Sequence, residues 1–328
     1  WVYIAIAADG STTTPTLANS FDAELFDPTT SSSALPVTGM GFKPDFVWAK
    51  YRDGAQSNYL VDSQRGLFSL MYSDRNDAAY TASNYVQSFD TDGITYVNNL
   101  FNRTGTDACV AWGWKGGGRG TINTDGTNAC IVSANAAAGF SIVKLTKDNV
   151  GVETFGHGLG VVPEMIILKR TVSADDWMIY HKDLGNTVRI SLNSTAAKVT
   201  GTGVWGSTTP TSSVFTLQNQ SGGAHIAYCF ASITAYSKIG TFSGNRPSTV
   251  TITTGFQPTW VLIKDTNNAE GWAIIDSARG DNLLEAQSTN PQSSYNSVQF
   301  TSTGFTVGDS GLVNTSGAEI LYMAIKEN

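Results

Sequence analysis

Short apolar segments recur along the whole chain, and each is bounded by residues that set turns. Residues 47–50 (VWAK), 59–62 (YLVD), 68–72 (FSLMY) and 140–145 (FSIVKL) are typical: they are rich in Val, Ile, Phe, Tyr and Trp. Gly, Pro, Asn, Asp, Ser and Thr separate such segments, and no segment carries a helical apolar stripe over three turns. The pattern therefore predicts an all-β chain of short antiparallel strands.

One short sequence motif, called the repeated phrase below, occurs three times, around Pro44, Pro163 and Pro258. The copies are GFKPDFVWAK, LGVVPEMIILK and GFQPTWVLIK. We expect each proline to lie just before a strand, where its missing N–H harms no hydrogen-bond ladder. Repetition on this scale indicates one structural unit used several times.

Each copy of the phrase leads to a closing run that is apolar on both faces. The three runs are CVAWGWK (109–115), HIAYCFAS (225–232) and ILYMAIKE (320–327). Alanine at alternate sites is typical of a central strand between packed layers. We therefore predict tandem antiparallel β-sandwich repeats, of the jelly-roll or concanavalin-like kind, with these runs as equivalent central strands.

The copies are unevenly spaced, which favours separate domains of about a hundred residues with variable loops over a solenoid of fixed period. The opening WVYIAIA matches the closing run ILYMAIK, and the chain begins with Trp1, so we expect a fragment or processed product that extends upstream. The predicted division is 1–7 as the closing strand of an upstream or first block, 8–35 as a linker, 36–115 as repeat 1, 116–232 as a linker strand and repeat 2, and 233–328 as a linker strand and repeat 3.

Composition narrows the functional classes. Of 328 residues only 14% are charged and 41% are hydrophobic, enough to build cores, and the net charge is −7 with no basic cluster. We therefore expect neither nucleic-acid binding nor membrane insertion. The three cysteines form no C-x-x-C pair; Cys109 and Cys229 are expected as buried free thiols, with a Cys109–Cys130 bridge as an alternative.

Several motifs resemble chemical sites but are expected to be structural. The repeated D-S-x-R-G, with Asp62 and Arg65 in one copy and Asp276 and Arg279 in another, predicts a turn held by an ion pair, because the second block has His181 at the Asp position. Asp90 and Asp92 begin like a calcium loop whose later ligands are missing, so a turn is expected and a metal site is the alternative.

Two glycine-rich stretches are interpreted in the same way. KGGGRG, residues 115–120, is expected to be a flexible joint, with an anion cradle of backbone N–H groups as the alternative. GTGVWG, residues 201–206, fits G-x-G-x-x-G, but no predicted helix follows it, so we interpret the match as coincidence.

We predict that the protein is not an enzyme. No G-x-S-x-G elbow and no E-x-D-x-E carboxylate pair occurs in the sequence, and the histidines are scattered. The remaining chemistry is adhesive, because loop aromatics among polar residues can stack on a sugar while their neighbours bind its hydroxyls. The candidate ligand-binding residues are Tyr72, Tyr80, Tyr85 and Trp205; packing within the loops is the alternative.

The phrases GHGLGVVPEMIILK, DDWMIYHKDLG, AYCFASITAYSKIGTFSGN, TTGFQPTWVLIK and ILYMAIKEN together resemble a family of virion proteins from tailed bacteriophages, many of them marine. The likeness extends over about 36–328 and implies tandem concanavalin-like sandwiches in a tail fibre, appendage or capsid decoration, with adhesion to the host surface as an associated role. It implies a location on the virion surface and no catalytic residues. No cofactor is expected, and calcium is an alternative that only the resemblance suggests. A carbohydrate-binding lectin-like module is the alternative, ahead of a polysaccharide-degrading enzyme.

The resemblance and the many expected edge strands also predict the partners. Exposed edges invite pairing with another chain, so we expect a homo-oligomer, such as a trimer, or an array on a larger particle. The expected partners are other copies of the chain, other virion proteins and host-surface glycans.

Overall fold

The regular structure of the described residues consists of antiparallel strands joined by turns and loops, which confirms the all-β fold class. The structure, a computed structural model, describes residues 17–28, 34–81, 85–97, 100–101, 108–148, 151–201, 203–280 and 282–327. In these ranges the helical element is a single turn, Ala136–Ala138. The predicted closing strand at residues 1–7 lies outside the described residues. No described helix has the length and apolar character needed to cross a membrane.

Each of the three repeats forms a large sheet that faces a smaller one. In the first block the large sheet has the order β1-β9-β3-β4-β5-β6 and the small sheet the order β2-β8-β7. The bounds are β1 Phe21–Phe26, β2 Leu35–Thr38, β3 Phe46–Tyr51, β4 Asn58–Asp62, β5 Ser69–Tyr72, β6 Tyr80–Thr81, β7 Val86–Asp90, β8 Gly93–Tyr96 and β9 Cys109–Trp114.

The second block has the widest sheet, in the order β10-β11-β12-β19-β14-β15-β16-β17, facing the pair β13-β18. Residues 116–135 contribute the extra strands β10 and β11 at its edge. The bounds are β10 Thr121–Asn123, β11 Cys130–Asn135, β12 Phe140–Lys147, β13 Glu153–Gly156, β14 Met165–Arg170, β15 Met178–His181, β16 Val188–Ser191, β17 Val199–Thr200, β18 Val214–Leu217 and β19 Gly223–Phe230.

The third block repeats the plan of the first, with a large sheet β20-β28-β22-β23-β24-β25 and a small sheet β21-β27-β26. The bounds are β20 Ser237–Ser243, β21 Val250–Thr253, β22 Trp260–Asp265, β23 Trp272–Asp276, β24 Asn282–Glu285, β25 Ser293–Ser294, β26 Val298–Thr301, β27 Gly304–Val307 and β28 Glu319–Ile325.

The three closing runs are equivalent central strands, as the sequence predicts. β9, β19 and β28 each lie between two strands of the large sheet. The register is shared, because the residue that opens β3, β14 or β22 pairs with the same closing-strand position. Those pairs are Phe46 with Trp114, Met165 with Phe230, and Trp260 with Ile325.

One predicted boundary needs correction. The expected linker, residues 8–35, contains β1, which pairs with β9 from Phe21↔Trp114 to Phe26↔Cys109. β1 therefore belongs to the first block, as β12 and β20 belong to theirs. All three cysteines are free and buried, which confirms the expectation for Cys109 and Cys229 and excludes the alternative Cys109–Cys130 bridge.

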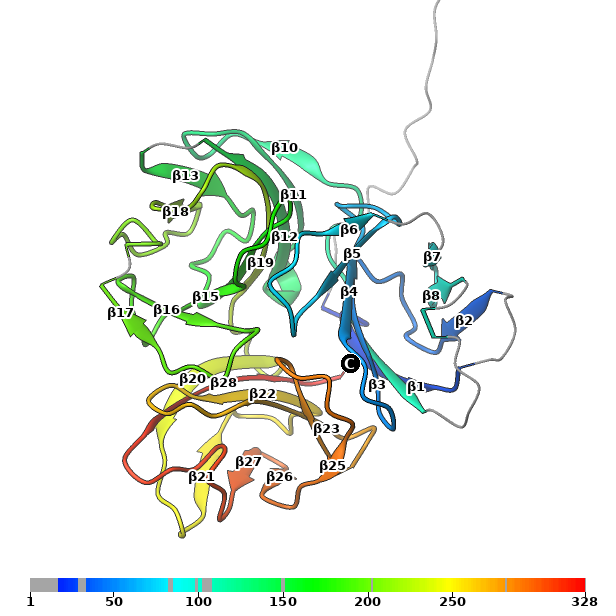
Figure 1. Cartoon of the computed structure of the whole chain (residues 1–328), viewed down its shortest axis with the longest axis vertical. Coiled ribbons are helices and arrows are strands. Elements are labelled where there is room, and N and C mark those ends of the chain that lie inside the picture. Colours follow the sequence, from blue (N-terminus) through cyan, green and yellow to red (C-terminus); the bar gives the residue numbers. More distant parts are fainter. Residues whose placement is uncertain are drawn as a thin grey trace, which may run out of the picture.

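The closing strands join the blocks because they bury both faces. Within β9 the bulky Val110, Trp112 and Trp114 point into a large core shared by all three blocks. The small residues that alternate with them, Cys109 and Ala111, point into the sandwich core of the first block. The other closing strands alternate in the same way, with Tyr228 and Met323 in the shared core. Figure 1 shows the result: three lobes around a common centre, with the C-terminus beside it.

Hydrogen bonds from equivalent side chains cross each boundary between blocks. In each block one donor stands where the chain enters β4, β15 or β23, opposite the lysine of the repeated phrase. Its side chain donates to a main-chain carbonyl of the neighbouring block. The three bonds run from Asn58 Nδ2 to Glu285 O at 3.2 Å, from Trp177 Nε1 to Tyr72 O at 2.8 Å, and from Trp272 Nε1 to Ser191 O at 2.9 Å.

The lysine of the repeated phrase makes a second set of crossings. Lys50, Lys169 and Lys264 are buried, and burial lowers the pKa of each to about 8. Each ammonium donates both to its own hairpin loop and to the next block. The crossing bonds run from Lys50 Nζ to Ser288 O at 2.8 Å, from Lys169 Nζ to Asn76 O at 3.1 Å, and from Lys264 Nζ to Thr195 O at 3.2 Å.

Both sets run in the same direction around the molecule. The first block donates to the third, the second to the first, and the third to the second. Such a cycle closes only if the blocks are related by a pseudo-threefold axis, so one chain contains a ring of three related units.

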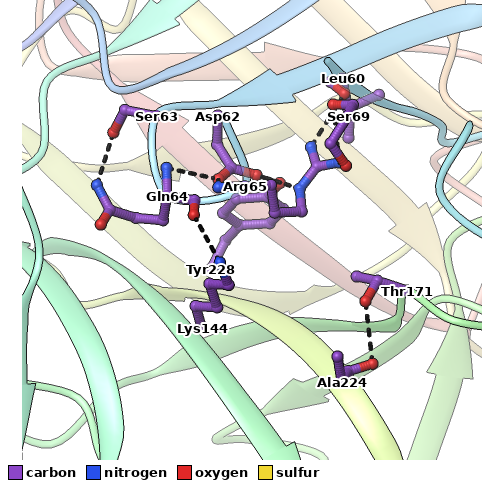
Figure 2. A network of polar contacts seen from close by, with 10 residues as sticks. All are labelled: Leu60, Asp62, Ser63, Gln64, Arg65, Ser69, Lys144, Thr171, Ala224 and Tyr228. Carbon is purple, nitrogen blue, oxygen red and sulfur yellow. Dashed lines mark hydrogen bonds and ion pairs between the residues drawn. The ribbon is translucent and has the colours of Figure 1, made fainter. Parts of the chain in front are cut away.

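Figure 2 shows a third crossing, which uses one of the predicted turn pairs. Asp62 and Arg65 form a buried ion pair, and the Asp62 carboxylate also accepts backbone N–H groups of its own turn. The Tyr228 hydroxyl of the second block donates to Asp62 Oδ2 at 2.8 Å. A buried carboxylate is tolerated because its oxygens are satisfied in this way.

The boundary between the first and third blocks repeats the arrangement. Asp276 pairs with Arg279 at 2.6 Å, and both side chains are fully buried. Trp112 Nε1 of the first block donates to Asp276 Oδ2 at 2.8 Å, and the Arg279 guanidinium lies over the Trp112 ring, 5.4 Å from its centroid. Trp112 and Tyr228 hold the same register position.

At the remaining boundary all three components change together. His181 stands at the Asp position, Leu184 at the Arg position, and Met323 at the position of Trp112 and Tyr228. Burial lowers the pKa of His181 to about 4, so its imidazole is neutral. Met323 removes the hydrogen-bond donor that Tyr228 or Trp112 provides, and His181 removes the carboxylate that would need that donor.

We expect Tyr228→Phe to lower the free energy of unfolding by about 1–3 kcal/mol, because it removes one hydrogen bond to a buried carboxylate. Tyr228→Ala should cost about 3–5 kcal/mol, because a cavity is added. Chemical denaturation measures both. Met323→Leu is the matched control and should cost less than about 1.5 kcal/mol. A cost for Tyr228→Phe below about 1 kcal/mol would contradict the role of the Asp62 bond.

A second prediction concerns pH. The pKa of Lys50 is about 8 in the folded protein against an ordinary value of 10.5, so between these values the unfolded chain binds the extra proton and stability rises with pH. The difference in unfolding free energy between wild type and Lys50→Met should therefore grow from pH 7.5 to pH 10. Urea titrations across this range measure it, and Lys43→Met, at an exposed position, controls for removing a surface lysine. A constant or shrinking difference would argue against a lowered Lys50 pKa.

Candidate functional site

Three of the four aromatic residues expected to bind a ligand come together on the first block. Tyr72 ends β5, Tyr80 begins β6, and Tyr85 immediately precedes β7. The strands that carry Tyr72 and Tyr80 are neighbours in the large sheet, with Leu70 paired to Tyr80. Adjacent positions at one end of a sheet therefore bring residues from separate segments into one cluster.

The rings of this tyrosine cluster (Tyr72, Tyr80 and Tyr85) form a surface that is half open to solvent. The Tyr80 and Tyr85 ring centroids are 6.0 Å apart, and Tyr80 is 51% exposed. Tyr72 rests on Tyr59 at 5.7 Å, which anchors it to the core of the first block. Burial, followed by the proximity of Tyr85, raises the pKa of Tyr72, so its hydroxyl is a neutral donor and acceptor at physiological pH.

Arg75 joins the cluster, and the sequence analysis did not identify it. Its guanidinium lies over the Tyr72 ring, 4.7 Å from the centroid. Its contacts with Asp74 and Asp77 are 3.8 and 3.9 Å long, beyond hydrogen-bond length, and its side chain is 50% exposed. Arg75 follows Tyr72 by three residues in the YSDRND stretch, which was the available signal.

The loop that carries Arg75 is fixed to both neighbouring blocks. Ser73 Oγ donates to Ala286 O of the third block at 2.6 Å. On the other side, Asn76 O accepts from Asp175 N at 2.8 Å, and Ala79 N donates to Thr171 O at 2.9 Å. The cluster therefore lies on a rigid support where the blocks meet.

Equivalent positions in the other blocks carry no aromatic ring. Register places Ser191 and Glu285 where the first block has Tyr72. It places Val199 and Ser293 where the first block has Tyr80. Because the scaffold is the same, the scaffold alone does not require aromatics there, and the first block is specialised at this position.

Trp205, the fourth expected ligand-binding residue, lies elsewhere and is buried. It is 1% exposed, its Nε1 donates to Val188 O at 3.1 Å, and its ring packs on Tyr180 at 5.6 Å. It belongs to the sandwich core of the second block. The expectation that this ring faces outward was wrong, because its polar neighbours hid a position that packs between the two sheets.

Asp90 ends β7, and Asp92 lies in the tight turn that precedes β8. Asp92 accepts N–H groups of the chain before β3, from Gly41 at 2.6 Å and Gly39 at 3.2 Å. A Cβ at Gly93, where φ is +139°, would lie 2.0 Å from Val37 O, so glycine is required by the close approach of β2. Within the described residues, no three His, Cys, Asp or Glu side chains converge to hold a metal.

The KGGGRG stretch does hold an anion, but it is a carboxylate of the same chain. Asp45 Oδ2 accepts from Gly116 N at 2.9 Å and from Gly118 N at 3.1 Å. A Cβ at Gly117 would lie 2.6 Å from Ala134 O. The glycines therefore permit close packing between blocks, and the stretch is pinned rather than a free joint.

We expect Trp205→Ala to lower the free energy of unfolding by about 3–5 kcal/mol, because it empties a closely packed core position. Tyr80→Ala should change it by no more than about 0.5 kcal/mol, because the ring is at the surface. Thermal and chemical denaturation measure both. A mild Trp205→Ala together with a strongly destabilising Tyr80→Ala would reverse the assignment of core and surface.

Comparison with known proteins bears on the chain as a whole. No curated protein matches the sequence. A family model described as a domain of unknown function, DUF7483, matches residues 18–328, which includes all three blocks and the tyrosine cluster. The chain belongs to the DUF7483 family.

Proposed function

We propose that this protein is a structural component of a tailed-phage virion, as a tail fibre, appendage or capsid decoration, and that it contacts the host surface. The observation that carries the proposal is the shared core of the three blocks, together with the hydrogen bonds that circle the pseudo-threefold axis. A body of this kind keeps its shape as one unit, which is what an appendage subunit needs. The phrases that resemble phage virion proteins support the same function.

Three buried carboxylates have structural partners, which favours a structural role over catalysis for these residues. Asp62 and Asp276 are committed to buried ion pairs, and Asp45 is enclosed by backbone N–H groups. A glycosidase needs two carboxyl groups that flank a bond in an open cleft. We therefore propose a non-catalytic protein on the virion surface, with other virion proteins and further copies of itself as partners.

A second candidate, a lectin-like carbohydrate-binding module, is favoured by the tyrosine cluster. Its half-exposed rings and the nearby polar groups of Arg75 and Asp77 are of the type that binds sugars. The two candidates are compatible, since an adhesive site could be part of a virion subunit.

The location is tested on particles of the phage that encodes this chain. Mass spectrometry of gradient-purified virions should find the protein in stoichiometric proportion to other structural proteins. Immunogold electron microscopy should place label at a regular position on the particle surface, with antiserum pre-adsorbed on the pure protein as control. Protein that is present in the infected-cell lysate but missing from purified virions would overturn the proposal.

A further inference from the structure

We propose that the tyrosine cluster with Arg75 and Asp77 is a binding site for neutral glycans, built from hexoses without carboxylate or sulfate groups. This inference deepens the adhesive role proposed above and rests on it. Its basis is the combination of an open aromatic surface, a donor and an acceptor beside it, and the sign of the local charge.

The aromatic surface supplies the stacking contact. Tyr80 and Tyr85 lie with ring centroids 6.0 Å apart and planes tilted by 35°. The carbon-bound hydrogens on one face of a pyranose form an apolar patch, which packs on a ring face as other apolar groups do. Tyr80 is half exposed, so its ring is accessible without rearrangement.

Arg75 and Asp77 supply complementary polar groups at the edge of this surface. Arg75 Nη1 and Asp77 Oδ2 are 3.9 Å apart, and the exposed fractions of the two side chains are 50% and 57%. A guanidinium donates to a hydroxyl oxygen, whereas a carboxylate accepts from a hydroxyl hydrogen. Neighbouring hydroxyls of a sugar, which both donate and accept, fit such a pair.

The local charge selects the neutral class. Asp74 Oδ2 lies 3.8 Å from Arg75 Nε, and Asp77 Oδ2 lies 3.9 Å from Arg75 Nη1. The nearby ammonium groups of Lys50 and Lys169 are buried and donate to main-chain carbonyls. Asp175 and Asp176 add two further carboxylates beside Lys169. An incoming uronate or sialate would have to displace or repel these carboxylates. A neutral sugar meets no such opposition.

The site is also prepared in advance and specific to one block. The loop of Arg75 is fixed by bonds to the second and third blocks, so little ordering entropy is lost on binding. The equivalent of Tyr80 in the second block, Val199, is 44% exposed and offers no ring. Val199 therefore provides a matched control at the same place in the fold.

The experiment uses the full chain and a panel of soluble oligosaccharides. The panel contains neutral gluco-, galacto-, manno- and N-acetylhexosamine oligomers, uronate oligomers and sialylated oligosaccharides. Saturation-transfer NMR detects binding, and calorimetric titration measures the affinity of each binder. We expect at least one neutral oligomer to bind, with Tyr80→Ala weakening it by about tenfold or more and Tyr80→Phe by less than about threefold, because the ring face is kept.

Val199→Ala should leave the affinity unchanged, and circular dichroism with thermal melting should show that Tyr80→Ala remains folded. The inference is overturned if no neutral oligomer binds, or if binding is insensitive to Tyr80. It is also overturned if the acidic oligomers bind more tightly than the neutral ones and Arg75→Gln abolishes that binding. The site would then be specific for carboxylates. None of these results bears on whether the protein is found in virions.

Discussion

The burial of both faces of the three closing strands, each face in a different core, is the constraint on which the rest of the structure depends. Bulky residues on one face of β9, β19 and β28 can leave water only if the three large sheets pack against one another. The other face of each closing strand packs inside its own sandwich, with small residues in β9 and β19 but with Ile320 and Tyr322 in β28. An isolated block would leave the first of these faces in water, so the blocks form one body.

Once the three sheets face each other, every polar group at the boundaries needs a partner. The chain meets this need by repetition, since the buried lysine and the Asn or Trp opposite it donate across all three boundaries in the same direction. The Asp–Arg turn is retained at two boundaries, where Tyr228 or Trp112 completes it. At the third, His181, Leu184 and Met323 replace the set together, because a buried carboxylate without its donor would be costly.

This architecture separates the parts of the chain that must be alike from those that can differ. The strands and the boundary donors carry the repeat. At the end of β5 and in the loop after it only main-chain carbonyls accept the boundary bonds, so the side chains there can differ between blocks. Tyr72 and Tyr80 stand where the other blocks have Ser191 and Val199 or Glu285 and Ser293. The inter-block bonds that hold the ring together also fix the loop of Arg75, so the rigidity of the body extends to the candidate site.

The sequence alone determined the strand content, the three repeats, the prolines ahead of β3, β14 and β22, and the central position of the closing strands, because these follow from local periodicity and turn chemistry. It also indicated that Asp62–Arg65 and Asp276–Arg279 belong to turns. Only the tertiary structure decided that both faces of the closing strands are buried by different neighbours, since period-two alternation does not say what covers each face. For the same reason Trp205 and Tyr80 look alike as loop aromatics in sequence, yet one packs between two sheets and the other meets solvent. Arg75 lies over the Tyr72 ring because its loop is held by hydrogen bonds to residues of another block, about a hundred positions away in the sequence.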